Sequence, residues 1–254
     1  MSTVELEHPT FAPQHVGHQF EELEQQNDAY IVGIWIFLVT EIMFFGALFL
    51  ALTIYRYNYA TAFEEAHNAL NWKLGMLNTF ILLTSSFFMA MAVRAKTLDI
   101  RSQAKFWLGL TLLCAFGFLT VKYFEYSAEI REHHFPGPTF RWEAPSKANI
   151  EANTPLIQMS QAPKGIASLG NYTPQPIEHH AHQLFFSLYF IMTGLHGLHV
   201  LVGILVLGCL WVLIAVKHPA VEDYMPLEIG GIYWHFVDIV WIFLYPLVYL
   251  IGRQ

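Results

Sequence analysis

The chain has 254 residues, of which 55% are hydrophobic and 13% are charged, and its net charge at pH 7 is −7. Soluble domains carry about 25% charged residues, so this composition indicates a protein that folds in lipid. The negative net charge argues against nucleic-acid binding, which needs basic surface patches. The two cysteines, Cys114 and Cys209, form no closely spaced pair, which excludes a zinc knuckle and a dinuclear copper motif.

Five apolar runs follow a polar, acidic tail formed by residues 1–30, in which we expect no cleaved signal peptide. Each run is long enough to cross a bilayer core of about 30 Å, which takes about 20 helical residues. We therefore predict an all-α fold, an integral-membrane bundle of five transmembrane helices in a single membrane domain, residues 31–254. The predicted spans are residues 31–55, 74–94, 104–126, 183–216 and 229–251.

Residues 127–182, between the third and fourth spans, are rich in Pro, Gly, Asn and Ser. This composition predicts a long extramembrane loop, because its prolines forbid a long helix. The short loop from residue 94 to 105 carries an excess of basic residues, which is typical of the cytoplasmic side. We thus expect a cytoplasmic N-terminus, with the 127–182 loop and the C-terminus on the outer side. The N-terminal tail has no Lys or Arg, which runs against this orientation.

Ionisable residues occur inside the predicted spans, where an isolated charge costs about 2.5–3.5 kcal/mol. With a rise of about 1.5 Å per residue, Glu41, the His196/His199 pair and Asp238 fall at similar depth on three helices, and His235 falls one turn away from Asp238. Residues three apart share a helix face. We predict that Glu41, His196, His199, His235 and Asp238 form a buried polar cluster that ties the helices together by hydrogen bonds.

Other chemistry is open to these residues. His196 and His235, on different helices, could ligate one haem. Glu41 could relay protons, because burial raises the pKa of a carboxyl group. The motifs EHH (132–134) and EHHAH (178–182) flank the long loop and could together hold an ion. We favour solvated histidines there and predict no metal site.

Two further groups of residues stand out. Lys122 and Glu125 predict an ion pair near the outer end of the third span, or a contact with a lipid headgroup or a partner. Gly194, Gly197 and Gly203 accompany the histidine pair and predict a helix-packing face, since small residues let helices approach closely in lipid.

Four motifs together resemble subunit III of the haem–copper oxidases: FLVTEIMFFGALFLA (37–51), VKYFEY (121–126), TGLHGLHVLVG (193–203) and YWHFVDIVWIFLYPLVYL (233–250). The resemblance maps the family's carbodiimide-reactive glutamate onto Glu41 and its HGLH histidines onto His196 and His199. It maps the WHFVD motif onto residues 234–238. Trp234 and Trp241 in this region join Lys122 and Glu125 as candidates for lipid or interface contacts.

The resemblance implies a membrane companion of the catalytic subunit I, in a complex that also contains subunit II. It implies no catalytic residue, haem or copper in this chain, because haem and copper belong to the partner subunits. It further implies structural phospholipid, and a role in assembly, in stability and in proton uptake during oxygen reduction. The expected location is the bacterial inner membrane.

The chain departs from many members of this family in one respect. They have seven spans, and the two extra N-terminal helices form one wall of a lipid-filled cleft. Here a polar tail stands in their place, so another subunit would have to complete that cleft. The sequence leaves cytochrome c and quinol open as electron donors. It also leaves open a subunit of a related nitric oxide reductase, an independent proton-translocating protein and a small membrane cytochrome.

Overall fold

The computed structural model describes residues 19–132, 134–136, 140 and 176–251. Among them are five helices long and apolar enough to cross a membrane, which confirms the predicted fold class. The spanning helices are α1 (Leu23–Asn58), α3 (Trp72–Thr97), α4 (Arg101–Arg131), α6 (Pro176–Ala215) and α7 (Met225–Tyr245). Shorter elements are α2 (Ala60–Ala69), the 3-10 turn η2 (Pro219–Val221) and the π-helical segment η3 (Pro246–Leu250).

The helices extend beyond the apolar runs from which they were predicted. Helix α1 begins inside the polar tail, α4 continues into the predicted 127–182 loop, and α6 begins before that loop was expected to end. Polar residues cost little in a helix that projects into water, so hydropathy marks the bilayer crossing rather than the helix ends. Most of the long loop lies outside the described residues.

Local chemistry explains several helix ends. Asn71 caps α3 by accepting a hydrogen bond from the backbone N–H of Lys73 at 3.1 Å. Asp99 follows α3 with a positive φ of 53°, a conformation that Asp tolerates better than most residues. At the start of α7, Pro226 occupies the first turn, where its missing N–H would have had no helical partner.

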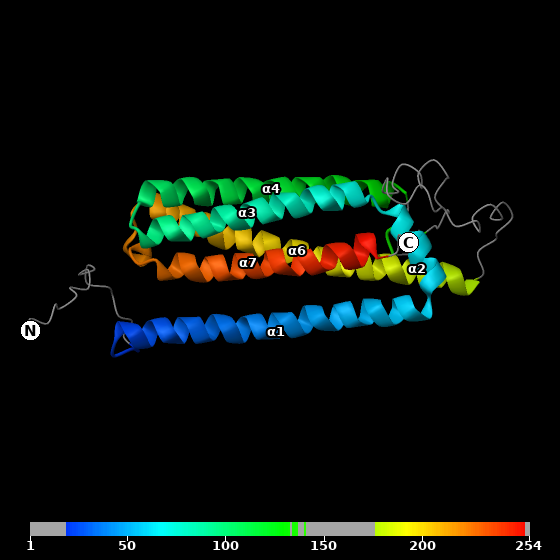
Figure 1. Cartoon of the computed structure of the whole chain (residues 1–254), viewed down its shortest axis with the longest axis horizontal. Helices are drawn as coiled ribbons and strands as arrows, with labels where there is room; N and C mark the ends of the chain where they lie inside the picture. The colour runs from blue at the N-terminus through cyan, green and yellow to red at the C-terminus, as the bar shows by residue number, and fades with distance from the viewer. Residues whose placement is uncertain (1–18, 133, 137–139, 141–175, 252–254) are drawn as a thin grey trace, which may run out of the picture.

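Helices α3, α4, α6 and α7 pack together, and α1 lies alongside them (Figure 1). We compare the most apolar 18-residue stretch of each helix. In α7, 50% of the residues in this stretch are buried, whereas in α1 only 11% are buried. Helix α7 is therefore the central element of the bundle. Helix α1 touches α6 and α7 through one narrow face and presents its other faces outward.

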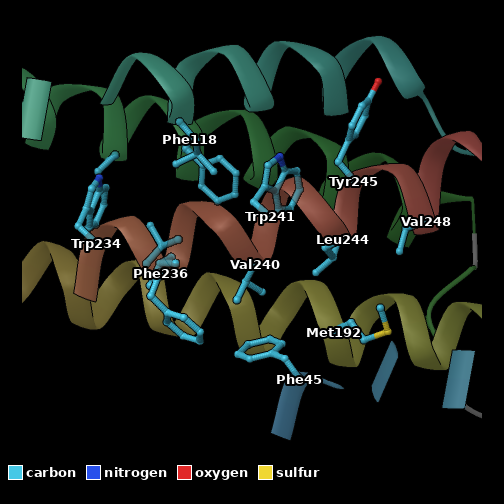
Figure 2. Packing of buried hydrophobic residues seen from close by; sticks show 14 of the residues in the cluster. Phe45, Phe118, Met192, Trp234, Phe236, Val240, Trp241, Leu244, Tyr245 and Val248 are labelled. Atoms are coloured by element: carbon cyan, nitrogen blue, oxygen red, sulfur yellow. The ribbon is translucent and has the colours of Figure 1, made fainter. Parts of the chain in front are cut away.

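Large aromatic side chains fill the core (Figure 2). Trp241 of α7 meets Phe118 of α4 edge to face, with ring centroids 5.0 Å apart. Trp234, two turns earlier on α7, lies against Gly203 of α6, and a Cβ at Gly203 would stand only 2.7 Å from its ring. The Trp234 indole N–H donates to the Ser85 hydroxyl at 3.0 Å, so the ring cannot retreat without losing that bond. Gly203 thus serves the close helix approach predicted for it.

We predict that Gly203→Val destabilises the chain by about 1–3 kcal/mol, because the added atoms overlap the held Trp234 ring. Gly197→Ala is the matched control, since a Cβ there would meet nothing within 4 Å. The free energy of unfolding in mixed micelles, followed by tryptophan fluorescence, measures both. Equal effects of the two substitutions would contradict the packing role of Gly203.

The C-terminal end of α7 changes to π-helical geometry at Pro246, which has no N–H to continue the α-helical pattern. Neighbouring helices contribute donors to the carbonyl groups of this segment. The His67 ring of α2 bonds the carbonyl oxygen of Val248, and Arg56 of α1 donates to that of Ile251 at 2.7 Å. The ends of α1 and α2 therefore anchor the C-terminal end of α7.

Candidate functional site: the buried polar residues

Glu41 and His199 meet across the α1–α6 interface at mid-span. The Glu41 Oε2 lies 3.2 Å from His199 Nε2, and both side chains are mostly buried. His199 Nδ1 lies 2.8 Å from the carbonyl oxygen of Leu195, which can only accept, so Nδ1 carries a proton. One further proton must then lie between Nε2 and Oε2, on either atom. The pair is a polar connection between α1 and the bundle, as predicted.

His235 and Asp238 share a turn of α7 but have different surroundings. His235 Nδ1 bonds the Ser86 hydroxyl of α3 at 2.6 Å, and its ring is half-buried. The carboxylate of Asp238 is buried and faces the Ser86 hydroxyl of α3 rather than an imidazole. Carboxylate and imidazole therefore do not pair on this helix.

His196 is enclosed without a partner among the described residues. Its ring packs against Trp241 at 5.1 Å and against Phe118 at 5.6 Å, centroid to centroid, and neither ring nitrogen has a hydrogen bond. These aromatic side chains occupy the space beside the imidazole. His196 and His235 thus do not fit haem ligation, because a porphyrin would need to displace the packed core. Of the predicted cluster, the structure joins only Glu41 and His199 directly.

Lys122 and Glu125 form an ion pair inside the bundle, where the sequence had suggested an interfacial one. Lys122 Nζ lies 2.9 Å from Glu125 Oε2, and both side chains are buried. Tyr189 of α6 donates to Glu125 Oε1 at 2.9 Å, and Tyr249 of η3 donates to the same oxygen. The lysine also lies 4.7 Å from the centre of the Trp241 ring, a cation–π arrangement. The four residues Lys122, Glu125, Tyr189 and Tyr249 form what we call the lysine cluster.

The lysine cluster was only partly visible in the sequence. The spacing of Lys122 and Glu125 predicted their pairing, but no pattern in the sequence marked Tyr189 or Tyr249 as their partners. Trp234 and Trp241, also candidates for lipid or interface contacts, are fully buried in the chain. None of these side chains reaches the lipid-facing surface.

Two histidines near the ends of the long loop are buried, whereas we had expected them to be solvated. His134 Nδ1 lies 2.7 Å from Glu129 Oε2, and its ring stacks on Phe186. His182 Nε2 lies 3.0 Å from Glu65 Oε2 of α2. Each of these two histidines thus has a carboxylate within hydrogen-bonding distance, which satisfies one nitrogen of its buried ring.

A metal ion has one candidate position in the described part of the chain. Atoms of Glu129, Glu132 and His134 lie within 4.8 Å of one another. Glu132 is exposed, and the Glu129–His134 contact already explains the two buried members. The EHHAH motif contributes nothing to this group among the described residues, because His182 is engaged with Glu65.

The glycines of α6 differ in role. Gly203 is closely packed, as described above. A Cβ at Gly194 would meet only the Tyr126 hydroxyl at 3.9 Å, and one at Gly197 would meet nothing within 4 Å. The predicted packing face is therefore concentrated at one of its three glycines.

The fold and these residues define a class of protein: a polytopic helical membrane protein whose polar side chains are turned inward and engaged chiefly with one another. Residues 171–253 match the family model described as Cytochrome c oxidase subunit III. This match includes α6, α7 and the histidine motifs.

Full-length relatives agree with this match. The chain is 24% identical over 238 residues to a probable quinol oxidase subunit 3 of Staphylococcus saprophyticus, an alignment that covers 94% of this chain and 96% of the relative. Similar proteins of the same description occur in Staphylococcus haemolyticus, 26% identical with 87% and 88% covered, and in Staphylococcus aureus strain USA300, 27% identical with 87% and 88% covered. The chain is thus similar to subunit 3 of quinol oxidases over most of its length, and its C-terminal third matches the subunit III family model.

Proposed function

We propose that the chain is a non-catalytic membrane subunit of a respiratory haem–copper terminal oxidase, in which it supports the assembly, stability and proton uptake of subunit I. The alignment with relatives named quinol oxidase subunit 3 carries this proposal, because it extends over nearly the whole of both chains. Haem and copper would reside in the partner subunits, and subunit II would complete the complex.

The arrangement of buried groups supports a bracing role. The lysine cluster and the Glu41–His199 pair connect different helices at specific points. Such hydrogen bonds fix how each helix is rotated about its axis and how far it is shifted along its axis. Apolar packing in lipid restrains both only weakly. A rigid bundle can then present a constant surface to a catalytic neighbour.

Quinol is the electron donor that we propose for the complex, because the relatives reported above are named for quinol oxidation. Cytochrome c is the alternative, since the matching family model is described by that donor. Oxidation of each donor by the purified complex, measured as oxygen consumption, separates them.

A groove between α1 and α7 offers a place for structural phospholipid. Its volume is about 610 Å³, and six residues of α1 and six of α7 line it. Apart from His235, the lining is apolar and includes Trp35, Leu38, Phe45 and Phe236. The lining residues extend along about four turns of α1 and three of α7, so the groove suits a hydrocarbon chain that runs along the membrane normal. We propose an acyl chain of a tightly bound phospholipid as its occupant.

Filling this groove should release the lipid. We predict that Leu38→Trp lowers the phospholipid that remains bound after delipidation, because the larger ring occupies the space for the acyl chain. Met43→Trp is the control, since Met43 is 71% exposed and does not line the groove. Lipid extraction and mass spectrometry measure the retained phospholipid. Equal retention in both variants would place the lipid elsewhere.

The chain is a multi-pass membrane protein, and we propose that it lies in the bacterial inner membrane with its N-terminus in the cytoplasm. The basic residues Arg94, Lys96, Arg101 and Lys105, around the α3–α4 connection, support this orientation. Cysteine labelling from either side of the membrane tests it at position 98 in that connection.

Affinity purification tests the proposed function. A tagged chain should bring down a haem-bearing subunit, and the complex should consume oxygen with quinol. Deletion of the chain should lower the yield of intact oxidase or shorten its active life. A chain that purifies alone and carries its own Soret band would instead be a cytochrome. Proton flux through the chain alone in liposomes, abolished by Glu41→Gln, would indicate a transporter.

A further inference from the structure

The short segment that follows α7, residues 246–251, is held by three of the other spanning helices through one side chain. Tyr249 is fully buried, and its hydroxyl accepts a hydrogen bond from Lys122 of α4 at 2.7 Å. Its ring lies 6.2 Å from that of Tyr189 on α6, centroid to centroid. A Cβ at Gly75 of α3 would come within 3.3 Å of the same ring. The segment is therefore docked on α3, α4 and α6 at once.

The same segment also binds α1 and α2, through its backbone. Arg56 of α1 donates to the carbonyl oxygen of Ile251 at 2.7 Å, and the His67 ring of α2 bonds that of Val248. The last carbonyl groups of a helix have no partner within the helix and form the negative end of its dipole. A guanidinium group is a favourable partner there. The segment thus connects α1 and α2 to the other helices.

Helix α1 depends on this connection more than the other helices do. In the described residues, two hydrogen-bonded contacts join it to the bundle: Glu41 with His199, and Arg56 with Ile251. They are about four turns apart along α1, or roughly 22 Å. Apolar contacts between helices are weak in lipid, because lipid tails can replace them. The buried residues of α1 are all apolar: Leu38, Phe45 and Leu52. Without the Arg56 contact, the C-terminal part of α1 is held by such contacts alone.

The groove between α1 and α7 lies next to this part of α1. Its lining ends at Phe49 on α1 and at Phe243 on α7. Arg56 and Ile251 follow these two residues by about two turns each, so their contact joins the two helices just beyond the C-terminal end of the groove. The contact is in a position to control how far α1 and α7 separate there.

We propose that residues 246–251 are a latch for α1. Docked, as in the structure, the latch holds the C-terminal end of α1 against the bundle. Released, it lets that end of α1 move away from α7, which widens the groove. The latch has two attachments, the Arg56–Ile251 contact and the position of Tyr249 in the lysine cluster, and loss of either one releases α1. This inference concerns the chain itself and depends neither on the proposed function nor on what occupies the groove.

Distances between pairs of spin labels on the full chain in lipid nanodiscs test the latch. Alanine first replaces the two native cysteines. Labels at Tyr57→Cys and Tyr123→Cys report the distance from the C-terminal end of α1 to α4. Labels at Val32→Cys and Leu113→Cys report the distance from α4 to α1 on the other side of the Glu41 contact. All four positions are exposed, so the labels do not disturb the core.

Two variants release the latch from its two attachments. Arg56→Met removes the donor to Ile251 and keeps an unbranched side chain, and Tyr249→Phe removes the hydroxyl and keeps the ring. Each should broaden the distance distribution of the 57–123 pair and shift it to longer distances. The 32–113 pair should keep the distribution of the unchanged chain. Arg131→Met is the matched control, because Arg131 is an exposed arginine in the last turn of α4, and it should change neither pair.

The two label pairs separate a latch from a general defect. A 57–123 distribution that stays narrow in either latch variant would overturn the proposal, because a latch requires both of its attachments. Equal broadening of both pairs would also overturn it, since the substitution would then have loosened the whole chain rather than one end of α1.

Discussion

Glu125→Gln should destabilise the chain by about 3–5 kcal/mol, the largest effect that we expect from a single substitution. The change keeps an amide oxygen that can accept the hydrogen bonds of Tyr189 and Tyr249. It removes the negative charge bonded to Lys122, whose ammonium group is buried among aromatic rings. A buried charge that loses its counter-charge is among the most costly defects in a protein interior.

Removing both charges together should restore much of the lost stability. In the double variant Lys122→Met/Glu125→Gln, the methionine fills the space of the lysine stem and no charge is left unpaired. The measurement is the free energy of unfolding in mixed micelles, followed by the fluorescence of Trp241 and the other tryptophans. If the double variant is less stable than Glu125→Gln, the ion pair is not what makes the single change costly.

The burial of Lys122 in the lysine cluster could not be predicted from the sequence, although the helix that carries it could. Hydropathy predicted the five long apolar helices, because the length of an apolar run is fixed by the bilayer. It placed Lys122 near a helix end, but α4 continues for more than two turns beyond that residue, to Arg131. Polar residues at the water-exposed end of a helix carry no hydropathy signal for the membrane, so Lys122 was assigned to the interface.

The position of a polar residue along its helix was easier to predict than the direction in which its side chain points around the helix axis. Counting residues placed Glu41 level with the His196/His199 pair, and in the structure Glu41 contacts His199 at 3.2 Å. The same counting suggested an imidazole partner for Asp238, yet its carboxylate bonds none of the predicted histidines and faces Ser86 instead. Both faces of these helices are apolar, because lipid and the protein core favour the same side chains. The sequence therefore contains little information on which way Asp238 points.

The Glu41–His199 pair leads to the second large effect, because it is a rare polar connection between α1 and the rest of the bundle. We expect Glu41→Leu to cost about 1–3 kcal/mol, since it leaves His199 Nε2 without its partner beside a weakly packed helix. In the proposed oxidase complex, the amount of this chain that co-purifies with the catalytic subunit should fall several-fold. Oxygen consumption per assembled complex should stay near that of the unchanged protein, because no reacting group is lost.

Glu41→Gln should behave differently from Glu41→Leu, and the reason lies in the proton of the pair. His199 Nδ1 donates to the Leu195 carbonyl, so Nε2 of a neutral ring is an acceptor and the glutamine amide can donate to it. Assembly should therefore survive in Glu41→Gln and decline in Glu41→Leu. Thr40→Val is the control, since Thr40 is exposed and its hydroxyl bonds only within α1. Equal assembly in both Glu41 variants would show that α1 is held by apolar contacts alone, whereas equal loss would show that the pair needs its negative charge.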